Sequence, residues 1–145
     1  MKPFLKVNGF SVFYAFMLFV PLELIMNVYR ISRLTGMELS TVIVLIGITI
    51  MIEVGVGSFI AFSLSSKLLD DRKANFWIVI LWVPYFVLFV YSLSTLFPIT
   101  YGGESPGPAL GLLAVGAFMV YPFYIVTILF LSASREEHMS TVTGK

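Results

Sequence analysis

The chain has 145 residues, of which 59% are hydrophobic and only 12% are charged, and its formal net charge is +1. A soluble domain carries about 25% charged residues, so this composition excludes an ordinary soluble protein. The absence of cysteine excludes disulfides, thiol redox chemistry, iron–sulfur clusters and thiolate zinc sites. The few basic residues are too scattered for a nucleic-acid surface, so no nucleic-acid partner is expected.

Four long apolar runs follow one another along the chain. A helix needs roughly 20 apolar residues to cross the hydrocarbon core of a bilayer, and each run is long enough to do so once. We therefore predict an all-α integral membrane protein, a four-transmembrane-helix antiparallel bundle that forms a single membrane domain over residues 1–145. The helices are expected near residues 7–29, 39–65, 75–97 and 108–132, and residues 133–145 are expected to form a polar cytoplasmic tail.

Basic residues in the short flanking segments predict the orientation. The two ends and the loop after the second helix share one side and carry Lys2, Lys6, Lys67, Arg72, Lys73, Arg135 and Lys145. The opposite side carries only Arg30 and Arg33. Because cytoplasmic loops are enriched in Lys and Arg, both termini are expected in the cytoplasm. The expected location is the plasma membrane of a prokaryotic cell, with the lipid bilayer as one partner.

The first run holds a proline and a carboxylate within "FVPLELIMNVYR". Glu23, Asn27 and Arg30 fall on a helical stripe about 60° wide. Pro21 has no N–H to donate to the carbonyl of Met17, so this helix is expected to kink and to expose an acceptor. Glu23 is predicted to bind a ligand or a proton together with Asn27. The alternative is that Asn27 and Arg30 satisfy Glu23 locally.

The second run holds Glu53 about 13 residues from either end of its helix, near the membrane midplane. A central charge costs roughly 2.5–3.5 kcal/mol on insertion scales, so an ionisable group there is a functional hypothesis. The alternative is a protonated carboxyl that hydrogen-bonds a tyrosine or a carbonyl and holds the bundle together. Gly55 and Gly57 lie close by and would allow another helix to approach. Glu23 is expected to lie roughly 10 Å nearer the external surface at 1.5 Å per residue.

The third and fourth runs each carry a central proline beside tyrosine: Pro84-Tyr85 in one, and Pro122 between Tyr121 and Tyr124 in the other. Counting from the expected helix ends places Tyr85 and Tyr121 level with the midplane carboxylate. Kinked helices around a central polar group are an arrangement used by small transporters. The alternative is that these pairs serve only packing and shape.

The sequence contains no recognisable set of catalytic residues. The only histidine, His138, lies beyond the last expected helix, so neither a haem between two histidines nor a histidine-rich metal site is expected in the bundle. We predict no cofactor and no metal, and we expect no enzyme. A membrane enzyme acting on lipid or quinone is the weakest option, since no catalytic set supports it.

Two functions remain. The first is a small transporter or ligand-binding bundle, expected to be a homo-oligomer, with Glu53, Tyr85 and Tyr121 as a midplane site and Glu23 as an outer relay or gate. The second is a non-catalytic accessory or regulatory subunit of a larger membrane protein complex, in which the glutamates would pair with groups on a partner.

Overall fold

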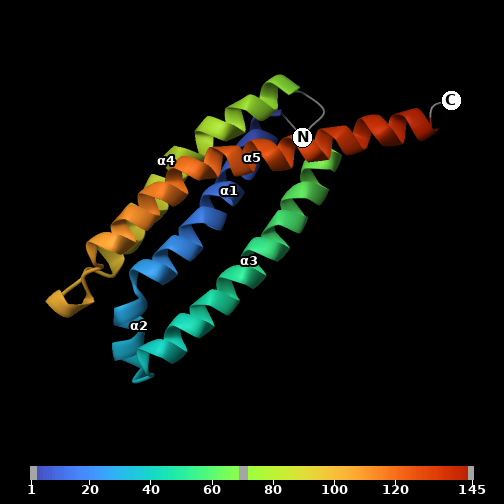
Figure 1. Cartoon of the computed structure of the whole chain (residues 1–145). Coiled ribbons are helices and arrows are strands. Elements are labelled where there is room, and N and C mark those ends of the chain that lie inside the picture. Colours follow the sequence, from blue (N-terminus) through green and yellow to red (C-terminus); the bar gives the residue numbers. More distant parts are fainter. Residues whose placement is uncertain (1–2, 69–71, 144–145) are drawn as a thin grey trace.

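The computed structural model describes residues 3–68 and 72–143, with side chains placed over residues 4–65 and 76–135. These parts of the chain are almost entirely helical (Figure 1). The helices are α1 (Pro3–Met26), α2 (Val28–Thr35), α3 (Leu39–Leu68), α4 (Arg72–Leu96) and α5 (Pro108–Thr143), and a short 3-10 helix, η1 (Gly102–Glu104), precedes α5.

Four of these helices, α1, α3, α4 and α5, are long and apolar enough to cross a membrane. Their outward faces carry large apolar side chains: Phe59 and Phe123 are each 71% exposed, and Leu112 is 75% exposed. Soluble proteins rarely leave contiguous apolar surface of this kind to water. The structure thus confirms an all-helical chain with four long apolar helices, and it indicates a membrane protein.

The helix ends differ from the expected ones at two places. The first long helix ends at Met26 rather than at 29, and α2 follows it as a separate helix that Gly36 ends in the left-handed conformation (φ 68°). Glycine adopts this conformation without steric cost. At the other end, α5 continues to Thr143 rather than stopping at 132. No glycine or proline interrupts residues 133–143, so nothing in the sequence stops the helix there.

Proline lies inside three of the long helices. Pro21, Pro84 and Pro122 are within α1, α4 and α5, and each helix continues through its proline. Each of these positions lacks the N–H that a helix interior normally uses. Each proline therefore leaves the carbonyl four residues earlier without its helical backbone donor, which is costly in an apolar medium.

The closest pair of long helices, α1 and α4, runs in parallel. Phe16 and Phe19 of α1 pack against Phe89 of α4, with ring centroids 6.1 and 5.5 Å apart. Nearer the start of both helices, the Tyr85 hydroxyl donates a hydrogen bond of 2.5 Å to Asn8 Oδ1. Residue numbers thus rise together along the two helices.

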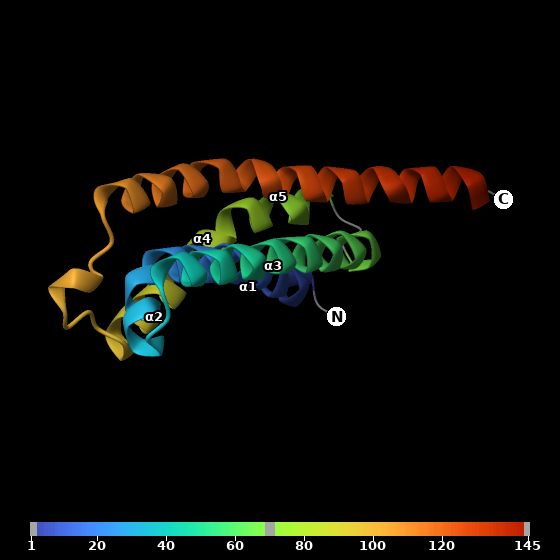
Figure 2. The same ribbon diagram turned by 60° about the horizontal axis from the view of Figure 1, so that its bottom comes forward.

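The other long helices complete an open arrangement around α1. α3 and α5 form a second parallel pair, and α5 also lies against α1 and α4 (Figure 2). Within the described residues α3 and α4 do not contact each other. Helices that are consecutive in the chain are therefore not all neighbours in space, although their directions alternate as the short connections predict.

The core gathers around α1. Tyr14, Trp82 and Ile125, from three different helices, are each 0% exposed, and the Trp82 and Tyr121 rings meet edge to face at 5.0 Å. A Cβ on Gly57 of α3 would lie 2.5 Å from Met17 Cε, so the end of the Met17 side chain would have to move if this residue were larger. Helix approach at a small residue is confirmed for Gly57. The same construction meets nothing at Gly55.

Candidate functional site

The chain breaks its helix at Asn27. The backbone there has φ −98° and ψ 14°, between the end of α1 and the start of α2. The Asn27 Nδ2 group donates to the backbone carbonyl of Glu23 at 2.9 Å and to Glu23 Oε2 at 2.9 Å. One amide side chain therefore holds both the helix end and the carboxylate. Glu23 and Asn27 come together as the sequence predicts.

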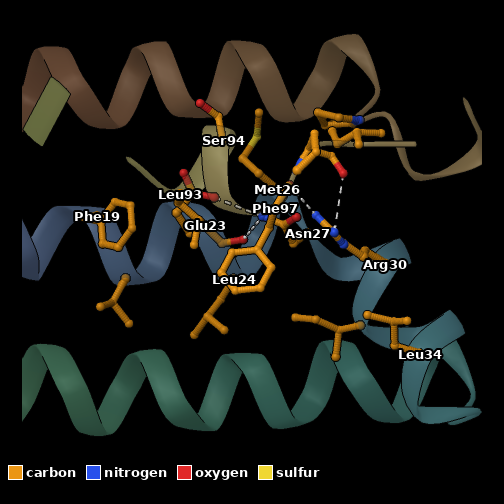
Figure 3. Close-up of a pocket in the computed structure, with 15 residues that line it drawn as sticks. Phe19, Glu23, Leu24, Met26, Asn27, Arg30, Leu34, Leu93, Ser94 and Phe97 are labelled. Atoms are coloured by element: carbon orange, nitrogen blue, oxygen red, sulfur yellow. Dashed lines mark hydrogen bonds between the residues drawn. The ribbon is translucent and has the colours of Figure 1, made fainter. Parts of the chain in front are cut away.

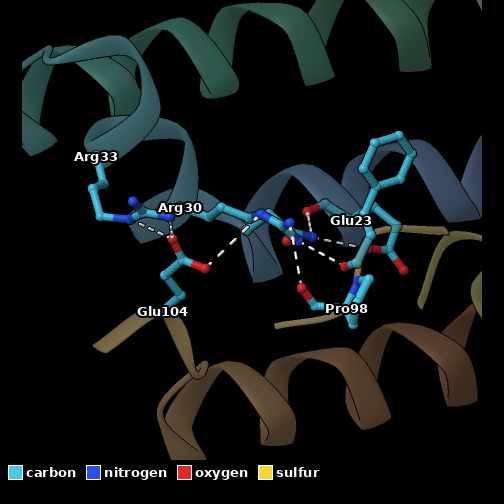
Figure 4. A network of polar contacts seen from close by, with 7 residues as sticks. Glu23, Arg30, Arg33, Pro98 and Glu104 are labelled. Carbon is cyan, nitrogen blue, oxygen red and sulfur yellow. Dashed lines mark hydrogen bonds and ion pairs between the residues drawn. The ribbon is translucent and has the colours of Figure 1, made fainter. Parts of the chain in front are cut away.

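Arg30 does not complete that pair but reaches the chain between α4 and α5. Its guanidinium donates to the carbonyls of Phe97 at 2.8 Å and Pro98 at 3.5 Å (Figure 4). Its Nε lies 3.9 Å from Glu104 Oε2. The alternative that Asn27 and Arg30 satisfy Glu23 locally therefore holds for Asn27 only, because Arg30 interacts with the carbonyls after α4 and with the carboxylate of η1.

Glu104 is the most buried charged side chain among the described residues and is 3% exposed. Arg33 Nε donates to Glu104 Oε1 at 2.5 Å, and Arg33 Nη2 forms an ion pair with the same oxygen. The Arg33 guanidinium also lies 5.5 Å from the centroid of the Tyr101 ring. A buried carboxylate is tolerated when it is paired and hydrogen-bonded. Arg30 and Arg33 thus fasten the α4–α5 connection onto α2.

An open-sided cavity of about 750 Å³ lies between α1, α2, the end of α4 and the connection that Arg30 holds (Figure 3). Its walls are mainly apolar and include Phe19, Leu24, Leu93 and Phe97. Ligand pockets usually have volumes of roughly 300–1,000 Å³, with apolar walls and a few polar groups that fix orientation. This cavity fits that description, and its polar wall holds the Glu23 side chain.

The two carboxylates near the cavity, Glu104 and Glu23, differ in their ion pairs. Glu104 is matched by two arginines, whereas Glu23 forms no ion pair with any residue that the structure describes. Its only hydrogen-bond donor among the described side chains is Asn27. Glu23 therefore presents a carboxylate with unused acceptor capacity to an apolar cavity.

The residues expected around Glu53 are only partly together. The Glu53 carboxyl lies within electrostatic reach of Tyr121 and Tyr124 of α5. The Tyr124 hydroxyl hydrogen-bonds Ser58 Oγ at 2.6 Å. Tyr85 is elsewhere: its hydroxyl is bound to Asn8. Counting from helix ends matches residues in depth, but it does not show which faces of the helices meet.

The offset between the two carboxylates is also smaller than expected. Met17 packs on Gly57, and α1 and α3 run in opposite directions. Four residues after Met17 in α1 and four residues before Gly57 in α3, Pro21 and Glu53 therefore lie at the same level. Glu23 is two residues beyond Pro21, so the two carboxylates differ in depth by about 3 Å at 1.5 Å per residue. The two carboxylates therefore lie at similar depth but in different surroundings: Glu23 of α1 lines the cavity, and Glu53 of α3 does not.

Sequence reasoning missed three residues that shape these sites. Glu104 and Arg33 had a signal: the loop before the fourth helix carries a single carboxylate, on the same side as Arg30 and Arg33. Tyr14 had none, because a tyrosine in an apolar run is indistinguishable from a packing residue. Its backbone carbonyl accepts a 2.6 Å hydrogen bond from the Tyr121 hydroxyl, and its own hydroxyl is buried.

No protein-family model, curated protein or solved structure matches this chain. Within the part of the chain that the structure describes, no three His, Asp or Glu side chains gather to hold a metal ion.

Proposed function

We propose that this chain is an integral membrane protein that binds a small, largely apolar molecule carrying a cationic group, with Glu23 as its anchor. The α2 end faces the external side, and both termini are cytoplasmic, in keeping with seven Lys and Arg residues on one side against two on the other. A carrier or a receptor for such a molecule would use this site in the same way.

The single observation that carries the proposal is the unpaired Glu23 in a cavity of about 750 Å³. A carboxylate facing apolar walls is costly unless a partner is supplied. An ammonium group would supply that partner, and the attached alkyl or aromatic part would cover Phe19 and Leu93. Charge-assisted hydrogen bonds of this kind are about twice as strong as neutral ones.

A carboxylate-bearing ligand fits the site less well. It would repel Glu23, and Arg30, the nearest cation on the cavity wall, already donates to two carbonyls and approaches Glu104. The proposal therefore specifies the charge of the ligand, and it limits the apolar part only by the volume of the cavity.

The test compares alkyl ligands of one medium chain length that carry a primary amine, an alcohol or a carboxylate. Thermal unfolding of the purified protein in detergent should be shifted upward by the amine, less by the alcohol and least by the carboxylate. Glu23→Gln should remove the advantage of the amine. Glu38→Gln is the matched control, because Glu38 is an exposed carboxylate at the same end of the molecule. Equal shifts by all three ligands, unchanged in Glu23→Gln, would contradict the proposal.

A second function, a subunit of a larger assembly or a homo-oligomer, is favoured by the open faces of α3 and α5. A Cβ at Gly47 or Gly55 of α3, or at Gly111 or Gly116 of α5, would meet nothing within 4 Å. Small residues on exposed faces allow another transmembrane helix to pack closely. Gly47→Leu should then dissociate an oligomer that size-exclusion chromatography detects. A monomer in both wild type and variant would remove this second candidate.

A further inference from the structure

A second set of polar side chains lies inside the apolar helices, away from the cavity. We name it the α3 column: Glu53, Ser58 and Ser65 of α3, Tyr14 of α1 and Tyr124 of α5. The Tyr124 hydroxyl bonds Ser58 at 2.6 Å and lies within electrostatic reach of Glu53. The Tyr14 hydroxyl in turn lies within reach of Tyr124 and faces Ser65. Each member therefore has another member beside it.

Three buried atoms of the α3 column have no described partner at hydrogen-bond distance: Tyr14 OH, Glu53 Oε2 and Ser65 Oγ, although Tyr14 OH and Ser65 Oγ lie close enough to interact with each other. Tyr14 is 0% exposed and Ser65 is 2% exposed. An unpaired polar group in an apolar medium costs several kcal/mol. Buried sites lined by several polar groups are where proteins hold internal water. Water that joins these atoms would satisfy all three.

The α3 column runs from one end of the helices toward their middle. Ser65 lies at the end of the apolar part of α3, and Glu53 lies twelve residues earlier, about 18 Å away along the axis. Two further buried serines, Ser11 of α1 and Ser132 of α5, lie toward this same end. Polar side chains thus lead inward from the C-terminal end of α3.

We propose that the α3 column holds a chain of water molecules through which Glu53 exchanges a proton with the solution at the C-terminal end of α3. A solution acid gives up one proton, and each water or hydroxyl along the path accepts one proton and releases another. The Glu53 carboxylate becomes a neutral carboxyl, and only O–H bonds to the acid, the waters and the hydroxyls are exchanged. This path is independent of any ligand at Glu23.

The polar groups beside Glu53 define the first step of this path. Among the described side chains, the titratable groups that interact with Glu53 are Tyr121 and Tyr124 of α5. The Tyr121 hydroxyl is committed as a donor to the Tyr14 carbonyl at 2.6 Å. The Ser58 hydroxyl donates to the Val54 carbonyl at 2.6 Å, so the Tyr124 hydroxyl donates to Ser58, and the lone pairs of the Tyr124 oxygen remain available to accept from a water molecule.

The test follows the proton directly. Infrared spectra of the full chain in lipid nanodiscs should show a carbonyl band of a protonated carboxyl that disappears in Glu53→Gln. The rate at which deuterium oxide shifts this band should fall about tenfold or more in Tyr14→Phe and Ser65→Ala, since each removes a hydroxyl from the path. Ser65→Thr should restore the rate.

Matched controls remove hydroxyls outside the α3 column. Tyr85→Phe loses the bond to Asn8, and Ser92→Ala loses an exposed bond to the Leu88 carbonyl, so both should exchange like wild type. Unchanged rates in Tyr14→Phe and Ser65→Ala overturn the proposal, as does the absence of any band that depends on Glu53. If Tyr14→Phe does not fold, the comparison of Ser65→Ala with Ser65→Thr tests the proposal, because Ser65→Ala removes a single heavy atom.

Discussion

Glu23 and Glu53 are both carboxylates within long apolar helices, yet their surroundings differ. Glu23 lies beside a helix break, is held by Asn27 and faces a cavity of about 750 Å³. Glu53 lies in an unbroken helix among tyrosines, with one buried oxygen that has no described partner. Both side chains are partly buried, but Glu23 lines a cavity, whereas Glu53 does not and one of its oxygens is short of hydrogen bonds. Residue type alone therefore does not set the role of an intramembrane carboxylate.

The largest loss of stability is expected from the ion pair between Arg33 and Glu104, which holds the α4–α5 connection beside the Glu23 cavity. Arg33→Met should destabilise the protein by about 2 kcal/mol, because buried Glu104 keeps only Arg30 at 3.9 Å and water partly compensates. Unfolding by detergent titration measures the change. Arg135→Met is the control: this arginine lies 5.4 Å from the Phe62 ring and should contribute about 0.5 kcal/mol. Equal losses in the two variants would show that Glu104 does not need Arg33.

A smaller effect is expected where α1 meets α3 beside Glu53. Gly57→Ala should cost about 1 kcal/mol, because the new Cβ lies 2.5 Å from Met17 Cε and Met17 must move. Met17→Ala in the same chain should relieve this contact. Gly55→Ala meets open space and should be close to neutral in the same unfolding assay. A neutral Gly57→Ala would contradict this expectation and mean that the end of the Met17 side chain moves aside at no cost.

The smallest effect is expected from the hydrogen bond that joins α3 and α5. Tyr124→Phe removes the bond to Ser58 and should cost about 0.5 kcal/mol, since interhelical hydrogen bonds in membranes are weak on average. Tyr91→Phe, an exposed tyrosine on α4, provides the comparison in the same assay and should cost nothing measurable. A loss above that of Gly57→Ala would indicate that Tyr124 belongs to a larger cooperative network.

Much of the fold was predictable, because long charge-poor runs are set by bilayer thickness and not by details of packing. Counting from helix ends placed Tyr121 level with Glu53, near which it lies in the structure, but it did not show that Tyr124 lies there as well. The position of Tyr85 did not, because depth leaves the rotation and neighbours of a helix undetermined. The break at Asn27, where the side chain hydrogen-bonds the Glu23 carbonyl of its own helix end, was also missed, because nothing in the apolar pattern marks it.

The cavity could not be predicted from the sequence. It forms because Arg30 and Arg33 draw a loop more than sixty residues later in the chain against α2. The residues of that loop carry no pattern of their own apart from the lone carboxylate Glu104. Long-range ion pairs of this kind become visible only when the helices are placed in space.

The central claim is that Glu23, and not Glu53, anchors the ligand. Isothermal titration of an alkylammonium ion into wild type, Glu23→Gln and Glu53→Gln tests it most directly. We predict that Glu23→Gln weakens binding about tenfold or more, the loss of one charged hydrogen-bond partner, and that Glu53→Gln leaves it unchanged. Weakening in Glu53→Gln with full binding in Glu23→Gln would contradict the account.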